Sequence, residues 1–122
     1  MGFTKRGNIY QVSRQTGNHD TFLGISFAEN SEQTNLEVIE LEIYNSKKKE
    51  NPPSKKEVLE QVLVGLESVN QSLGTDYKLS KIYYVSCSNG PNAIYQSLIR
   101  TLIIHYHNGR KFRDFENELR EV

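Results

Sequence analysis

The chain contains no tryptophan, a single cysteine and no apolar run long enough to cross a bilayer. Because Cys87 is alone, neither an intramolecular disulfide nor a cysteine-based zinc site can form, which is typical of a reducing compartment. The most apolar stretch, residues 94–106, is too short and too polar to span a membrane. No apolar segment follows Lys5 and Arg6, so the N-terminus is not typical of a secretory signal. These absences predict a soluble, cytoplasmic protein without a membrane partner.

Positive charge is missing from one long segment. The chain carries 15 Lys and Arg against 15 Asp and Glu, yet no Lys or Arg occurs from Gln15 to Ser46. The acidic residues of this segment are Asp20, Glu29, Glu32, Glu37, Glu40 and Glu42. The order of the charges predicts one acidic face and a more basic remainder. Such a face is either solvated surface or a contact surface for a basic partner, and the pattern alone leaves both interpretations open.

Length and composition indicate one domain over residues 1–122. At 122 residues with 36% hydrophobic content, the chain can bury roughly two-thirds of the surface that it exposes when unfolded. Seven tyrosines and five phenylalanines supply bulky packing groups. One core without metals or disulfides is therefore expected.

Four segments have the composition and period of strands. The clearest is Leu36–Tyr44, where Ile39, Leu41 and Ile43 alternate with acidic residues. A period of two predicts that these three side chains enter the core, while Glu40 and Glu42 point to water on the other face. The other strands are expected at Asn8–Arg14, Thr21–Ala28 and Lys81–Ser88, the last apolar on both faces and therefore interior.

Two long helices are expected. Ser54 and Glu57 form a capping-box pattern before an apolar stripe that ends at Leu73, and Gly74 suits the left-handed position after a helix. A second helix is expected from Pro91 to about His107. The tail is interpreted as a short amphipathic helix, with a fifth strand at Lys111–Phe115 as the alternative.

The order of these elements predicts the fold class. It is β-β-β-α-β-α with a short C-terminal element, which we expect to form an α+β two-layer sandwich. The sheet is predicted to be mainly antiparallel and four-stranded, with both long helices on one face.

No pattern in the chain predicts a metal, a cofactor or bound nucleic acid. His105 and His107 are two residues apart, which places them on different helix faces instead of at the i, i+4 spacing of zinc sites. The junction Asn89-Gly90-Pro91 lacks the further glycines and the lysine of a phosphate loop. A sequence pI of about 6.8 is not that of a nucleic-acid-binding domain.

Cys87 is the one candidate nucleophile. It precedes a helix start, where the dipole can lower the pKa of a thiol. The nearest histidines in sequence lie toward the far end of that helix, about 20 Å away, and a lone cysteine is commonly a small buried apolar residue. An enzyme that uses Cys87 therefore remains an alternative to a binding protein, as does an oligomeric adaptor that uses an open sheet edge.

The pattern as a whole resembles the small immunity proteins with which bacteria neutralise toxin nucleases. The resemblance rests on Leu36–Tyr44 with its acidic residues, on the strand Lys81–Ser88 that leads into the helix from Pro91, and on the lack of a catalytic set. It implies a non-catalytic protein that blocks the active site or substrate groove of a cognate toxin. Separately, we expect a monomer over an oligomer. Nuclease toxins are basic because they hold nucleic-acid backbone, so an acidic face can imitate phosphates. The expected contacts are Glu37, Glu40 and Glu42, with Asp20, Glu29 and Glu32 on the rim.

Overall fold

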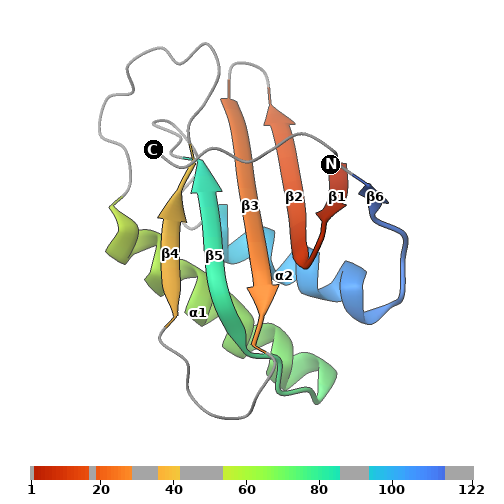
Figure 1. Cartoon of the computed structure of the whole chain (residues 1–122). Coiled ribbons are helices and arrows are strands. Elements are labelled where there is room, and N and C mark those ends of the chain that lie inside the picture. Colours follow the sequence, from red (N-terminus) through yellow and green to blue (C-terminus); the bar gives the residue numbers. More distant parts are fainter. Residues whose placement is uncertain (1, 17–18, 29–35, 42–53, 86–93, 115–122) are drawn as a thin grey trace.

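The structure is a computed structural model, and it describes residues 2–16, 19–28, 36–41, 54–85 and 94–114. These residues form a six-stranded sheet with both helices packed on one of its faces (Figure 1). The α+β class and the placement of both helices are confirmed. The strands are β1 Gly2–Arg6, β2 Ile9–Thr16, β3 His19–Phe27, β4 Glu37–Glu40, β5 Leu79–Val85 and β6 Arg113–Asp114, and the helices are α1 Lys55–Leu73 and α2 Ile94–His107.

The sheet is mixed, so the prediction of a four-stranded antiparallel sheet is wrong in detail. Its order is β4-β5-β3-β2-β1-β6, with β4 parallel to β5 and β6 parallel to β1. The chain leaves β4 through α1 and returns as β5, and such a helical crossover brings the chain back to the starting end, which favours a parallel neighbour. β5 lies between β4 and β3, as predicted for an interior strand.

Two further strands extend the sheet at its other edge. β1 was not predicted; it forms a hairpin with β2 through a tight turn at Gly7, whose φ of 56° suits glycine. Thr4 of β1 pairs with Arg113 of β6. This confirms the strand alternative for part of Lys111–Phe115, while the proposed tail helix falls mainly on residues outside those described.

The side chains of β4 point to the opposite faces of the sheet from those predicted. Val38 pairs with Ile82 and Glu40 pairs with Tyr84, and both partners belong to the core beneath the helices. Paired residues share a face, so Glu40 lies on the helix side of the sheet. Ile39, 9% exposed, is buried as predicted, but on the opposite face. The period of two fixed which residues of the strand share a face, whereas the register with β5 decided which face the helices cover.

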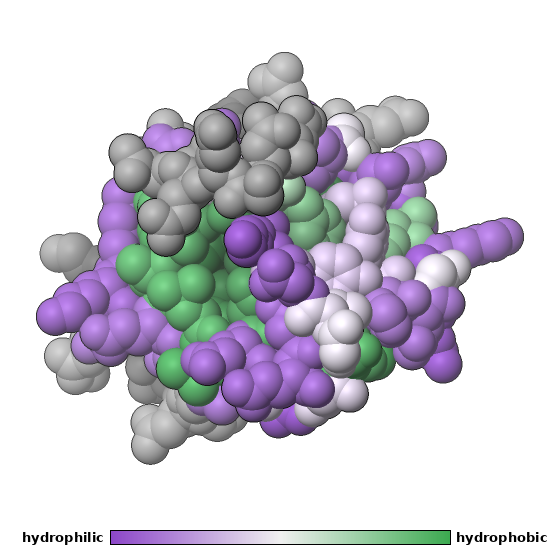
Figure 2. Space-filling model, turned by 90° about the horizontal axis from the view of Figure 1, so that it is seen from below, coloured by the Kyte–Doolittle hydropathy of each residue, from purple (hydrophilic) through white to green (hydrophobic). Residues whose placement is uncertain are grey.

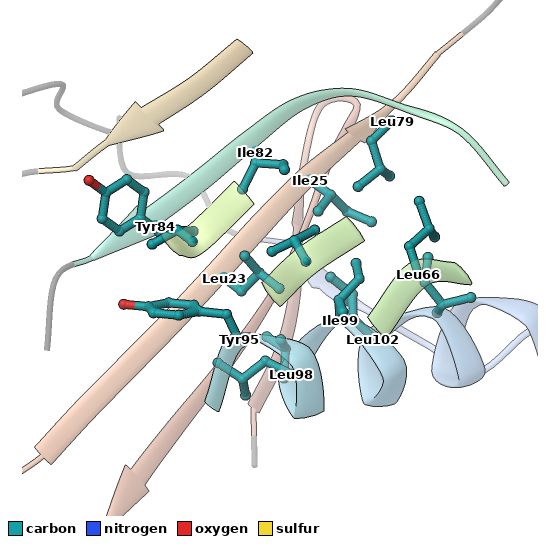
Figure 3. Close-up of a cluster of buried hydrophobic side chains, with 14 of the residues drawn as sticks. Leu23, Ile25, Leu66, Leu79, Ile82, Tyr84, Tyr95, Leu98, Ile99 and Leu102 are labelled. Carbon is teal, nitrogen blue, oxygen red and sulfur yellow. The ribbon is translucent and has the colours of Figure 1, made fainter. Parts of the chain in front are cut away.

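The core lies between the sheet and the two helices (Figure 3). Leu23 and Ile25 come from β3, and Ile82 and Tyr84 come from β5. They meet Leu66 of α1 and a group from α2 (Tyr95, Leu98, Ile99 and Leu102). The Tyr95 hydroxyl donates to the backbone oxygen of Val85 (2.8 Å) and ties α2 to the end of β5.

α1 begins and ends as its sequence predicts. The Ser54 hydroxyl accepts a hydrogen bond from the Glu57 amide at 3.2 Å, and Gly74 after the last turn has a left-handed φ of 67°. The buried residues of the helix are Val58, Val62, Gly65, Leu66 and Val69. Both ends of the helix are thus fixed by local chemistry.

Removing the cap should weaken the fold measurably. Replacing Ser54 with alanine leaves the Glu57 amide without its side-chain acceptor, and the free energy of unfolding should fall by about 1 kcal/mol. Urea denaturation of the two proteins measures this difference. Ser54→Asp, which keeps an acceptor, should retain most of the stability; an equal loss in both variants would contradict the capping role.

Candidate protein-binding surface

The two described glutamates of β4 do not form one acidic face. Glu37 is exposed and stands opposite Lys81, also exposed, on the face of the sheet away from the helices. Glu40 is half-buried and lies on the helix side, close enough to Tyr84 to influence its ionisation. The prediction that Glu40 points to water on the outer face of the sheet is therefore wrong, and Glu37 and Glu40, three apart on the strand, point to opposite faces.

The other predicted contacts cannot be placed as side chains. Asp20 belongs to the start of β3, where it pairs with Gln15 of β2. Glu29, Glu32 and Glu42 lie outside the described residues, as does Cys87. Their roles stay predictions.

The outer face of α1 combines exposed apolar side chains with negative charge. Leu63 is 42% exposed and Val64 is 53% exposed. Each of these two residues is three or four positions from Glu60 on one side and from Glu67 on the other. Side chains at such spacings are neighbours on a helix, so both apolar side chains lie between the two carboxylates. We call these four residues the α1 face. Exposed leucine and valine with carboxylates beside them match the arrangement of a contact surface, in which apolar side chains lie within a polar rim.

The sequence contains a signal for this face that lies outside the acidic segment Gln15–Ser46. From Glu57 to Tyr77 the chain again has no Lys or Arg, while Glu57, Glu60, Glu67 and Asp76 all occur there. The apolar stripe expected for this helix correctly included the buried residues Val58, Val62, Leu66 and Val69. It also included Leu63, which is largely exposed, whereas Val64 lies outside the stripe. Within the described part of the chain, the salt bridge found is the one between Lys78 and Asp76, at 3.9 Å. Glu60 and Glu67 are thus not neutralised by cations from the described residues.

A hollow of about 420 Å³ lies at the C-terminal half of α1 and the turn that follows. Its wall is held by Asn70, whose side-chain oxygen accepts hydrogen bonds from the Thr75 hydroxyl (2.8 Å) and the Tyr77 amide (3.0 Å). Its lining residues are Leu63, Leu66, Glu67, Asn70, Gln71, Thr75 and Asp76. We call it the α1 hollow, and it is continuous with the α1 face through Leu63 and Glu67.

Hydrophobic side chains also gather more widely on this side of the molecule. Figure 2 shows a hydrophobic area with hydrophilic residues around it on the left, the side on which β4 and the first turns of α1 lie in Figure 1. Besides the α1 face, Val38 of β4 and Leu59 of α1 are only half-buried. The edge of the sheet next to α1 is therefore more apolar than a fully solvated edge.

The two histidines of α2 serve in packing. His105 stacks on Phe3 with ring centroids 3.7 Å apart, and its Nε2 lies 2.9 Å from the Lys111 backbone oxygen. His107 Nδ1 lies 2.9 Å from the Tyr77 hydroxyl. Among the described residues, no group of three or more His, Cys, Asp or Glu side chains is arranged to hold a metal ion.

Two tyrosines have pKa values above the ordinary value of 10. Burial raises the pKa of Tyr84, which is 1% exposed, and the nearby Glu40 carboxylate adds to the effect. Burial also raises the pKa of Tyr106, with further contributions from Tyr10 and Tyr77 and an opposing one from Lys5. In both cases the folded protein favours the neutral phenol.

These shifts predict a loss of stability at alkaline pH. A raised folded-state pKa contributes stability that is fully present below pH 10 and is lost as the pH rises above 10 through the folded-state pKa. Tyr84→Phe keeps the buried ring and removes its ionisation, so the urea midpoint of this variant should fall less steeply above pH 10. Parallel pH profiles for the variant and the wild type would contradict the assignment to Tyr84.

No protein-family model matches the chain, and no curated protein or solved structure shows significant similarity to it. No helix among the described residues is long and apolar enough to cross a membrane.

Proposed function

We propose that this protein is a non-catalytic inhibitor that binds a basic, nuclease-type toxin and occludes its active site or substrate groove. The observation that carries the proposal is the α1 face, where Leu63 and Val64 are exposed between Glu60 and Glu67. Protein interfaces commonly place apolar anchors inside a polar rim. Carboxylates on that rim attract a basic partner and select against acidic ones.

The proposed contact surface extends from α1 to the neighbouring edge of the sheet. Glu37 is exposed at this edge but points to the face of the sheet away from the helices, opposite Lys81, so its contact stays a prediction outside the α1 face. Asp20, Glu29, Glu32 and Glu42 stay predicted rim contacts. Glu40 faces the helices and is left out of the proposed surface. The acidic surface is thus centred on a helix instead of on a strand.

The edge strand β4 disfavours an oligomer that forms by pairing of strands between two copies of the chain. β4 is four residues long and is the last strand on its side of the described sheet, with Glu37 and Glu40 at its ends. Short edges that carry charge disfavour pairing with a second sheet. We therefore expect the free protein to be monomeric and its partner to be a different chain.

The test begins with capture from the native host and ends with the purified pair. Wild-type protein serves as bait, and each captured protein is purified and assayed for nuclease activity with and without one equivalent of this chain. Stoichiometric loss of nuclease activity by a basic captured protein supports the proposal. A bound protein that is acidic, or a nuclease whose activity is unchanged in the complex, contradicts it.

A further inference from the structure

The C-terminal end of α1 has several sources of negative potential, and the described residues supply little positive charge to offset them. Glu67 and Asp76 line the α1 hollow. The carbonyl end of a helix also favours cations, and the last turn of α1 has no basic residue. The carboxylates and the helix end therefore attract positive charge to the same place.

Among the described residues, the cation that pairs with Asp76 contributes little compensation. Lys78 lies 3.9 Å from Asp76, but the side chains of the two residues are 51% and 88% exposed. An ion pair so long and so well solvated contributes little free energy. Lys78 is also not among the residues that line the α1 hollow. A second cation can therefore be accommodated there.

The α1 hollow has an apolar side as well as a charged one. Leu63 and Leu66 lie one turn apart on α1, and both line it. Asn70 fixes the opposite wall through its hydrogen bonds to Thr75 and Tyr77, including one from its side-chain nitrogen to the Tyr77 backbone oxygen (3.1 Å). This wall is thus formed in advance, which lowers the entropic cost of binding. The hollow, of about 420 Å³, is wide open to solvent, so a side chain can lie along it without being enclosed.

We propose that the α1 hollow takes the side chain of an arginine that the basic partner presents. Its methylene groups pack on Leu63 and Leu66, and its guanidinium lies between the carboxylates of Glu67 and Asp76. Arginine suits this place better than lysine because its guanidinium is weakly hydrated, donates in a planar fork to carboxylates and packs its stem on apolar surface. The inference rests on the proposed function, because the arginine belongs to the basic partner proposed there. It identifies the partner side chain that would anchor the complex.

The test uses capped arginine with the full-length protein, so it needs no partner. N-acetyl-arginine amide is titrated into ¹⁵N-labelled protein, and N-acetyl-citrulline amide, which has the same shape without the charge, is the matched control. We expect millimolar affinity for the arginine probe. Shifts should concentrate on the side-chain amides of Asn70 and Gln71 and on the backbone amides of residues 74–76. The citrulline probe should bind at least about tenfold more weakly, the loss expected for removing a charge-assisted contact.

Variants identify the carboxylates that act. Glu67→Gln and Asp76→Asn should each weaken the arginine probe about threefold, and the double variant about tenfold. Asp114→Asn removes the same kind of charge from β6, at the opposite edge of the sheet and away from the lining of the hollow, and should leave the affinity unchanged. A two-dimensional spectrum of each variant verifies that it is folded.

The inference would be overturned by equal affinity for the citrulline probe, by chemical-shift changes centred elsewhere on the protein, or by unchanged affinity in the double variant. Tighter binding of free L-arginine than of the capped form would also overturn it, because a residue within a partner chain has no free α-amino or carboxylate group. Failure of the probe leaves the broader partner-binding proposal intact. Failure to find a basic partner does not affect the outcome of the titration.

Discussion

Reversing the charge of the α1 face should weaken the complex with a basic partner about 30-fold. With Glu60→Lys and Glu67→Lys combined, each of the two positions loses an attraction and gains a repulsion. At about 0.5 kcal/mol for each of these four effects, the sum is about 2 kcal/mol. The loss should be larger at low salt, because the affected charges are solvated and screened. Surface plasmon resonance at two salt concentrations measures the affinity and the association rate, and so tests both the size of the loss and its dependence on salt.

A matched control separates this local effect from net charge. Asp114→Lys makes the same kind of charge reversal on β6, at the opposite edge of the sheet, where the side chain is exposed. It should change the affinity by less than about threefold, since exposed charges far from a contact are screened. An equal loss of affinity in the Asp114→Lys variant and in the double variant of α1 would show that the partner responds to total charge. The α1 face would then not be the contact surface.

Gly65→Ala should lower the free energy of unfolding by about 2 kcal/mol, although alanine is a better helix former than glycine. A Cβ at Gly65 would lie 2.5 Å from the Ile99 Cγ2 and 2.6 Å from the Gln96 backbone oxygen. The methyl group collides with the backbone of α2, so the two helices must move apart. An overpacking cost of about 3 kcal/mol outweighs the gain of about 1 kcal/mol from helix propensity.

Urea or thermal unfolding measures this loss, with Ser72→Ala as the control on the same helix. Ser72 is exposed, so its replacement should change stability by less than about 0.5 kcal/mol. Gly65→Ala combined with Ile99→Ala should lose less than the sum of the two single losses, because the shorter side chain removes one of the two collisions. A neutral or stabilising Gly65→Ala would show that the helices are not in close contact at this position.

The candidate surface was only partly predictable. The absence of Lys and Arg around Leu36–Tyr44 indicates an acidic segment. Lys and Arg are also absent from Glu57 to Tyr77, but there the dominant pattern is the apolar stripe of a helix. The stripe indicates which residues are buried, but it does not indicate that Leu63 and Val64 remain exposed between two glutamates. That exposure depends on where the sheet and α2 stop covering α1.

By itself, the sequence determined the elements whose signals are local. Ser54 and Gly74 mark the ends of α1 because a hydroxyl acceptor and a left-handed backbone are needed there whatever the rest of the chain does. The interior position of β5 likewise follows from a strand that is apolar on both faces. The tertiary structure decided the pairing of β4 and the direction of its side chains. Alternation shows that Glu37 and Glu40 point to opposite sides, but only the parallel register with β5 and the placement of both helices determine that Glu40 is the one facing the core.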